Sequence, residues 1–219
     1  MFVTIAALIL NGNNRIAMAY PVPFPPGPPY HLVVIGDSIT GGSDMGGVGP
    51  HGWPVLAVNT LQSQGIALEP LISGDGGSGY VEVGLNGTTF EGQGVGLIEP
   101  DDRVIVFFGS RNDMTHPIDV VADAMYRTFR DARNVAPYAV LVVIGPVWPE
   151  PNPPHEVLVV RDTLAREAAE ADAVWVDPIA ERWLTTPGMM GVDGIHPNND
   201  GHKELASRIG PIIKASLGF

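Results

Sequence analysis

The chain contains no cysteine, and this absence excludes disulfides, thiolate nucleophiles and cysteine-ligated metals without fixing the cellular compartment. Basic residues are also scarce. Only 12 lysines and arginines stand against 24 aspartates and glutamates, which gives a formal net charge of −12. Such a surface repels phosphate backbones and anionic lipid headgroups. We therefore expect no nucleic-acid partner and no strong membrane association.

Long hydrophobic runs are missing as well. The apolar stretch at residues 1–10 is too short for a transmembrane helix, which needs about 20 residues. Residues 17–19, Ala-Met-Ala, resemble a signal-peptide cleavage site, but no basic residue precedes the apolar stretch and NGNNR interrupts it. Two interpretations stay open: a signal segment, with a secreted or envelope-associated protein, or an apolar arm on a soluble cytoplasmic protein.

The remaining composition is that of one globular domain. The chain has 219 residues, of which 45% are hydrophobic and 16% charged, and this is enough for a single core. The proline-rich stretch PVPFPPGPP at residues 21–29 favours an extended, stiff spacer. We therefore expect an N-terminal arm and linker over residues 1–30 and one domain over residues 31–219.

Short apolar runs recur along this domain and predict its strands. Three of them are nearly continuous in valine, isoleucine, leucine and phenylalanine, which is typical of parallel strands that are covered on both faces. The second run contains Pro70, which an edge strand tolerates because it lacks a neighbour on one side. The five runs are residues 31–36, 67–72, 103–109, 139–145 and 173–177.

Amphipathic stretches alternate with these runs and predict helices over residues 117–136, residues 153–171 and from Asn199 towards the C-terminus. Gly210 and Pro211 are expected to kink or split the last helix. Alternating strands and helices predict an α/β fold, a three-layer α/β/α sandwich around a central, mostly parallel five-stranded sheet.

One stretch does not follow this alternation. Residues 74–96 are dense in glycine, which favours irregular backbone over a regular element. We expect a long loop there, with a short strand at residues 80–85.

Polar residues follow four of the predicted strands. Ser38 follows the first strand, glycines at 74–77 the second, residues 110–113 the third and residues 193–197 the fifth. Right-handed crossovers bring the carboxyl ends of parallel strands to one edge of the sheet, where open α/β sheets bind their ligands. The topology therefore predicts that these four segments meet.

Together the four segments hold the groups that acyl transfer requires. A serine hydroxyl such as that of Ser38 needs a base to take its proton, and His196 is the candidate. Asp193, three residues earlier, can orient the imidazole and stabilise its protonated form. The oxyanion of a tetrahedral intermediate needs preset donors, which the Ser38 amide, a glycine amide from 74–77 and the Asn112 side chain can supply.

The same motifs resemble the GDSL, or SGNH, hydrolase family. The chain has GDSIT at residues 36–40, a glycine-rich second block, Asn112-Asp113 in the third block and DGIH at residues 193–196. The likeness covers most of residues 31–217, with the four blocks in the family's order. It implies a flavodoxin-like α/β/α fold and hydrolysis of carboxylic esters without a metal or other cofactor.

The resemblance also implies roles for individual residues. Ser38 is the nucleophile, His196 the base and Asp193 the third member of the triad; the Ser38 amide, a glycine and Asn112 form the oxyanion hole. The glycine stays open: SGD favours Gly74 and GGSGY favours Gly77, towards which we lean. Ser110 stands where the third block of the family usually has glycine.

Several neighbouring residues have competing interpretations. Asp37 and Asp113 are expected to brace loops by accepting backbone hydrogen bonds, with Asp37 the rival orienter of His196. Arg111 is expected to tether an acid or touch substrate, and Trp148 to line the pocket or pack in the core. Four other histidines are too scattered for a metal site and are expected to be solvated or to cap helices: His51, His116, His155 and His202.

The sequence therefore predicts a serine esterase acting on a small-molecule, carbohydrate or lipid ester, with short-chain or acetyl esters favoured. A transferase or thioesterase with the same triad is the alternative within this chemistry. The alternative from another class is an inactive binding or envelope-attached module that has kept the fold. A nucleotide-binding protein is disfavoured because the chain lacks a phosphate loop with lysine.

Overall fold

The computed structural model describes residues 27–94 and 96–219. The predicted arm and the signal-segment question fall on residues 1–26, outside the described part, so the domain boundary stays a prediction. No helix in the described part is long and apolar enough to cross a membrane.

A single sheet of five parallel strands forms the centre of the domain, as the apolar runs predict. Its strand order is β2-β1-β3-β4-β5, the flavodoxin-like order, and β2 with Pro70 lies at an edge as expected. The strands are β1 (Tyr30–Gly36), β2 (Leu68–Gly74), β3 (Asp102–Phe108), β4 (Val140–Ile144) and β5 (Val174–Val176).

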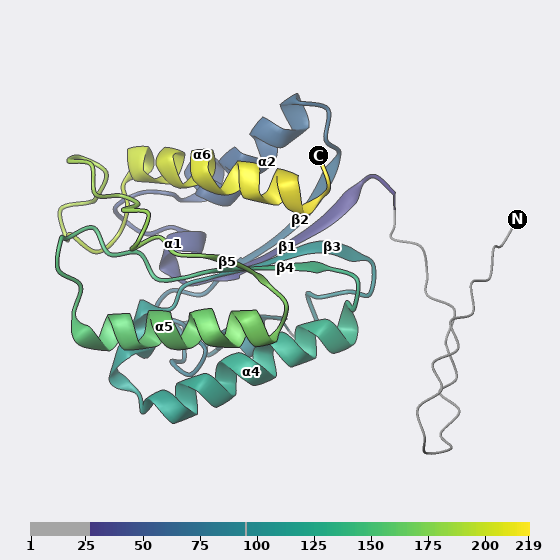
Figure 1. The fold of residues 1–219 in the computed structure, drawn as a ribbon. Coiled ribbons are helices and arrows are strands. Elements are labelled where there is room, and N and C mark those ends of the chain that lie inside the picture. Colours follow the sequence, from purple (N-terminus) through teal and green to yellow (C-terminus); the bar gives the residue numbers. More distant parts are fainter. Residues whose placement is uncertain (1–26, 95) are drawn as a thin grey trace, which may run out of the picture.

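Helices cover both faces of the sheet (Figure 1). One face carries α2 (Trp53–Ser63) and α6 (Asn199–Ser216), and the other carries α4 (Ile118–Val135) and α5 (His155–Glu170). Successive side chains of β1 alternate between the two layers: Leu32 and Val34 join the core under α2 and α6, while Val33 and Ile35 join the core under α4 and α5. The predicted three-layer α/β/α sandwich is therefore confirmed.

The stretch at residues 74–96 is mostly irregular, but it differs from the expectation in two ways. No strand forms at residues 80–85, because the Asp113 carboxylate accepts the backbone amides of Tyr80, Val81 and Glu82, which are then unavailable to a strand ladder. A short helix, α3 (Phe90–Gly94), closes the loop instead.

The last helix, α6, runs unbroken through Pro211, so the expected split is wrong. Proline removes one backbone donor, but Ser207, whose carbonyl would accept that bond, lies on the exposed side of the helix. Leu205, Ile209 and Ile213 are all buried on the inner side and hold both halves of the helix against the sheet. Packing therefore outweighs the loss of one hydrogen bond.

Three further short elements lie at the carboxyl edge of the sheet or beside it: α1 (Ser38–Gly41), the 3₁₀ turn η1 (Gly49–His51) and the 3₁₀ turn η2 (Arg111–Thr115). Two of them carry predicted site residues, because α1 begins at Ser38 and η2 contains Asn112.

Candidate active site

A cavity of about 490 Å³ opens at the carboxyl edge of the sheet, where the four predicted segments meet. Its volume falls within the range of small-molecule sites. Ser38, Gly77, Asn112 and His196 line it, each from a different strand-following segment. Its other walls are formed by Asp37, Ile39, Gly42, Ser43, Asp44, Gly76, Leu85, Arg111 and Ile195.

Ser38 lies at the junction of β1 and α1, in a turn that Asp37 holds. The Asp37 side chain caps α1, with Oδ1 accepting the Ile39 amide at 2.8 Å. The carboxyl is almost fully buried, at 1% exposure. Burial raises the pKa of Asp37 to about 6, although the Ile39 hydrogen bond and the charge of Arg111 act in the opposite direction. Asp37 thus braces the loop as expected.

Ser38, His196 and Asp193 are joined by hydrogen bonds. His196 Nε2 lies 3.0 Å from Ser38 Oγ, and His196 Nδ1 lies 2.7 Å from Asp193 Oδ2. Asp193 Oδ1 also accepts the backbone amides of Ile195 and His196. Hydrogen bonding from the His196 side chain, helped by these amides, lowers the pKa of Asp193 to about 2. The carboxylate that lies beside the imidazole is therefore that of Asp193, whereas Asp37 caps α1.

Asn112 presents its side-chain amide to the same cavity from η2. Its Nδ2 donates to the Ser78 carbonyl at 2.8 Å and lies 3.4 Å from Asp37 Oδ2. The neighbouring Asp113 is fully buried and accepts three backbone amides and the Ser110 hydroxyl. Ser110, at the family's usual glycine position, thereby helps to anchor the turn that carries Asn112.

The two candidate glycines lie in different surroundings. Gly77 lines the cavity with a φ of +78°, a conformation that favours glycine. Gly74 ends β2 and packs against α1, where an added Cβ would lie 2.3 Å from the Gly41 nitrogen. Alanine at Gly74 would therefore displace α1, and alanine at Gly77 would strain its own backbone. Neither alanine substitution isolates the loss of an amide donor.

Comparison with known proteins places this arrangement in a family. Residues 34–204 match the model of the GDSL-like lipase/acylhydrolase family, which spans most of the chain. The chain belongs to this family. It is a carboxylic ester hydrolase.

Relatives and solved structures agree with this assignment. GDSL lipase Rv0518 of Mycobacterium tuberculosis is 41% identical over 190 residues, which cover 85% of this chain and 82% of that protein. The crystal structure of TesA matches with a TM-score of 0.70 at 22% identity, over 85% of this chain and 99% of TesA. Axe2, an acetylxylan esterase from Geobacillus stearothermophilus, matches with a TM-score of 0.66 at 17% identity, over 90% of this chain and 97% of Axe2. Both structures share the fold of the hydrolase.

Arg111 and Asp75 shape the site of this hydrolase beyond the family motifs. The Arg111 guanidinium lies 4.5 Å from the centre of the Trp148 ring and lines the cavity, whereas Trp148 does not line it. Asp75 was not singled out by sequence reasoning, although it follows β2 directly. Its buried carboxylate holds the turn at residues 84–88.

The other histidines do not form a metal site, since the described residues contain no cluster of three or more potential metal ligands. His51 and His155 are exposed, and His116 bonds Glu82 at 2.6 Å. His202 is buried, contrary to a solvated role, but its Nδ1 accepts the Trp53 amide at the start of α2, which is the capping role. Burial lowers the pKa of His202 to about 4, so the ring is neutral at pH 7.

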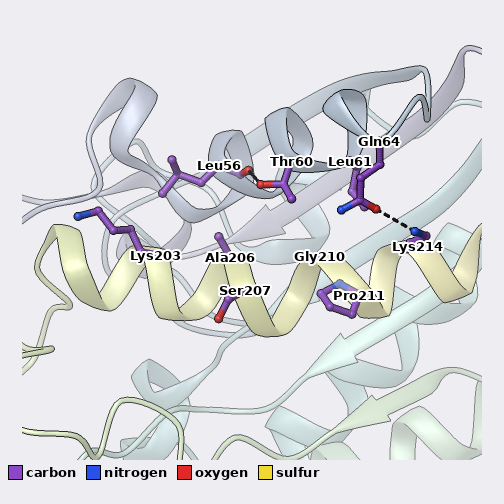
Figure 2. Close-up of a pocket in the computed structure, with 10 residues that line it drawn as sticks. All are labelled: Leu56, Thr60, Leu61, Gln64, Lys203, Ala206, Ser207, Gly210, Pro211 and Lys214. Carbon is purple, nitrogen blue, oxygen red and sulfur yellow. Dashed lines mark hydrogen bonds between the residues drawn. The ribbon is translucent and has the colours of Figure 1, made fainter.

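A larger cavity of about 640 Å³ lies between α2 and α6 and is distinct from the active site (Figure 2). It holds none of the predicted site residues, and the Gln64–Lys214 hydrogen bond at one end joins the two helices. By volume alone, this cavity would be the first candidate for a binding site. Its walls, however, contain no nucleophile with an adjacent base. The predicted site residues meet in the smaller cavity.

Replacing the buried carboxyl of Asp37, beside Ser38, tests the electrostatics of the site. Because folding raises the pKa of Asp37 from 3.8 to about 6, the folded enzyme binds this proton more tightly than the unfolded chain. The contribution of Asp37 to stability, present at low pH, should therefore fall by roughly 2–3 kcal/mol as the pH rises from about 4 to about 7. The Asp37→Asn variant keeps a side-chain oxygen that can accept the Ile39 amide, but it has no carboxyl group to titrate.

Urea unfolding of both proteins at a series of pH values measures the difference. The free energy of unfolding of Asp37→Asn should rise relative to that of the wild type across this window, because the contributions of titrating groups that do not interact with Asp37 cancel. Parallel pH curves for the two proteins would show that Asp37 is ionised as readily in the folded enzyme as in the unfolded chain.

Proposed function

We propose that the enzyme hydrolyses carboxylic esters through an acyl-enzyme intermediate on Ser38, with His196 as general base and Asp193 as the orienting acid. The observation that carries the proposal is the pair of hydrogen bonds from Asp193 through His196 to Ser38, at 2.7 and 3.0 Å. Both lengths suit proton transfer and orientation without rearrangement.

The reaction proceeds in two halves. Ser38 Oγ attacks the ester carbonyl carbon while His196 Nε2 takes the hydroxyl proton, and the tetrahedral intermediate then expels the alcohol, which receives that proton. Water next attacks the acyl-enzyme, with His196 taking its proton, and the acid is released as Ser38 recovers its hydrogen. Asp193 stays ionised throughout, because its pKa of about 2 lies far below neutral pH.

The oxyanion of each tetrahedral intermediate is stabilised by three donors: the Ser38 amide, the Gly77 amide and the Asn112 side chain. The lining of the cavity by all three residues supports this set. Gly74 remains the alternative glycine because its SGD context resembles the family's second block. Its packing against Gly41 favours a structural role.

Short-chain or acetyl esters are the proposed substrates, carried on small-molecule, carbohydrate or lipid alcohols. The solved structures that share the fold include the acetylxylan esterase Axe2 and a carbohydrate esterase family 2 enzyme from Corynascus thermopiles. These likenesses support carbohydrate acetates as one substrate class to test. None of the proposed steps uses a cofactor.

Hydrolysis of p-nitrophenyl esters and acetylated oligosaccharides at varied pH, with and without EDTA, tests the proposal. We expect turnover to be unchanged by EDTA, because no proposed step uses a metal. The mechanism requires neutral imidazole at His196, because only that form accepts the serine proton. No acid-side loss should come from Asp193 above about pH 3, since its pKa is about 2. Loss of activity in EDTA that zinc restores would contradict this mechanism.

A further inference from the structure

Leu85 combines high exposure with a place in the active-site wall. Its side chain is 90% exposed, yet it lines the cavity that holds Ser38. Its Cδ1 lies beside Gly76, 3.3 Å from the point where a Cβ on that glycine would stand. An apolar side chain is thus presented to solvent at the mouth of a polar site.

The turn that carries Leu85 is firmly held. The buried Asp75 carboxylate accepts the Asn86 amide at 2.9 Å and both the amide and the hydroxyl of Thr88. The Leu85 amide donates to the Gly76 carbonyl, and Gly84 exchanges backbone bonds with the same turn. Burial alone would raise the pKa of Asp75, but the hydrogen bonds from Thr88 and Asn86 hold it below its ordinary value. The exposure of Leu85 is therefore built into the loop.

The chemistry of the site decides which part of the substrate meets Leu85. His196 must protonate the departing alcohol, so the alcohol lies on the side of His196 and its neighbour Ile195, which also lines the cavity. The carbonyl oxygen faces the donors, which include Gly77. Leu85 contacts the adjoining Gly76, next to the proposed donor Gly77. Since His196 places the alcohol, the acyl group is the substituent of the carbonyl carbon left to meet this wall.

We infer that Leu85 is the specificity-determining side chain for the acyl group, and that among the short-chain esters of the proposed function it favours linear apolar acyl chains longer than acetyl. This inference rests on the proposed function. An acetyl group carries no methylene, whereas each methylene of a longer chain buries apolar surface of the chain and of Leu85 together. Binding removes this leucine from water, which accounts for its position on an anchored turn.

The test compares kcat/KM for p-nitrophenyl acetate, butyrate and hexanoate, all below the concentration at which they aggregate. The wild type should prefer hexanoate to acetate, and Leu85→Ser should lower the hexanoate-to-acetate ratio of kcat/KM values about tenfold. Leu85→Met, which keeps the apolar contact, should retain the wild-type ratio. Val83→Ser is the matched control, because Val83 is 56% exposed nearby and does not line the cavity.

The outcomes separate this inference from the proposed function. Wild type that hydrolyses acetate, with the same chain-length ratio in Leu85→Ser, would overturn the role of Leu85 and leave the esterase mechanism standing. An equal fall in Val83→Ser would assign the preference to general surface hydrophobicity and would also overturn it. Wild type that hydrolyses none of the esters would refute the proposed function itself.

Discussion

Ser38→Ala is expected to lower kcat for ester hydrolysis by at least about 10⁴-fold while leaving the fold intact. The side chain supplies the attacking oxygen, and no other hydroxyl is bonded to His196 in the described part of the chain. Its loss removes one hydrogen bond at the surface of a cavity and no core contact, so the melting temperature should change little. Steady-state kinetics and thermal unfolding of the purified variant measure both quantities.

Ser63→Ala provides the control for this substitution. Ser63 ends α2 and its hydroxyl donates to the Thr60 carbonyl, remote from the four segments of the site. Its variant should hydrolyse esters at the wild-type rate after the same purification. Turnover retained by Ser38→Ala at more than a trace level would remove Ser38 as the nucleophile.

Asn112→Ala is expected to lower kcat by about 10²–10³-fold, or roughly 3–4 kcal/mol, with little change in KM. The proposed donor bonds the oxyanion more strongly than the ground-state carbonyl. Its loss therefore raises the free energy of the transition state more than that of the bound substrate. The existing bond to the Ser78 carbonyl holds Nδ2 in place before substrate arrives. Kinetics under saturating and limiting substrate separate kcat from KM.

An amide-to-ester exchange at Gly77 is the companion experiment, because it removes the backbone donor without adding a Cβ. A fall in kcat similar to that of Asn112→Ala would agree with Gly77 as the glycine donor. A fall produced by the same exchange at Gly74 instead would move the role there. If Asn112→Ala raised KM alone, Asn112 would bind substrate rather than stabilise the oxyanion.

The sheet and the position of the site were predictable because they depend on short-range patterns and one topological rule. Nearly continuous apolar runs predict buried parallel strands, and the carboxyl ends of such strands share one edge. Ser38, Asn112 and His196 were assigned to that edge from sequence, and all three line one cavity. The spacing of Asp193 and His196 was also sufficient, since both belong to one short loop.

The loops around the site were not predictable, because their conformation depends on buried carboxylates that bind distant amides. Asp113 orders residues 80–82 from more than thirty positions away, and Asp75 orders the turn at residues 84–88. Neither contact leaves a periodic pattern. A single leucine in a glycine-rich segment is typical of an irregular loop. The sequence therefore does not indicate that Leu85 lines the cavity.

Helix α2 was missed for a related reason. The segment before it is rich in glycine, and Trp53 and Pro54 at its start resemble a continuing loop. The helix is stabilised by tertiary contacts: Ala57 and Leu61 are buried against the sheet core, and the His202 ring accepts the Trp53 amide. Such a cap, supplied from 149 positions along the chain, gives no local signal.

Covalent labelling with a fluorophosphonate, followed by peptide mapping in a mass spectrometer, tests the central claim most directly. The reagent is attacked by an activated serine and leaves a stable phosphonyl group on its oxygen. We predict one adduct per chain, on the peptide that contains Ser38, and no adduct in Ser38→Ala. An adduct on another residue, or none at all in a preparation that hydrolyses esters, would contradict the assignment of Ser38 as the nucleophile.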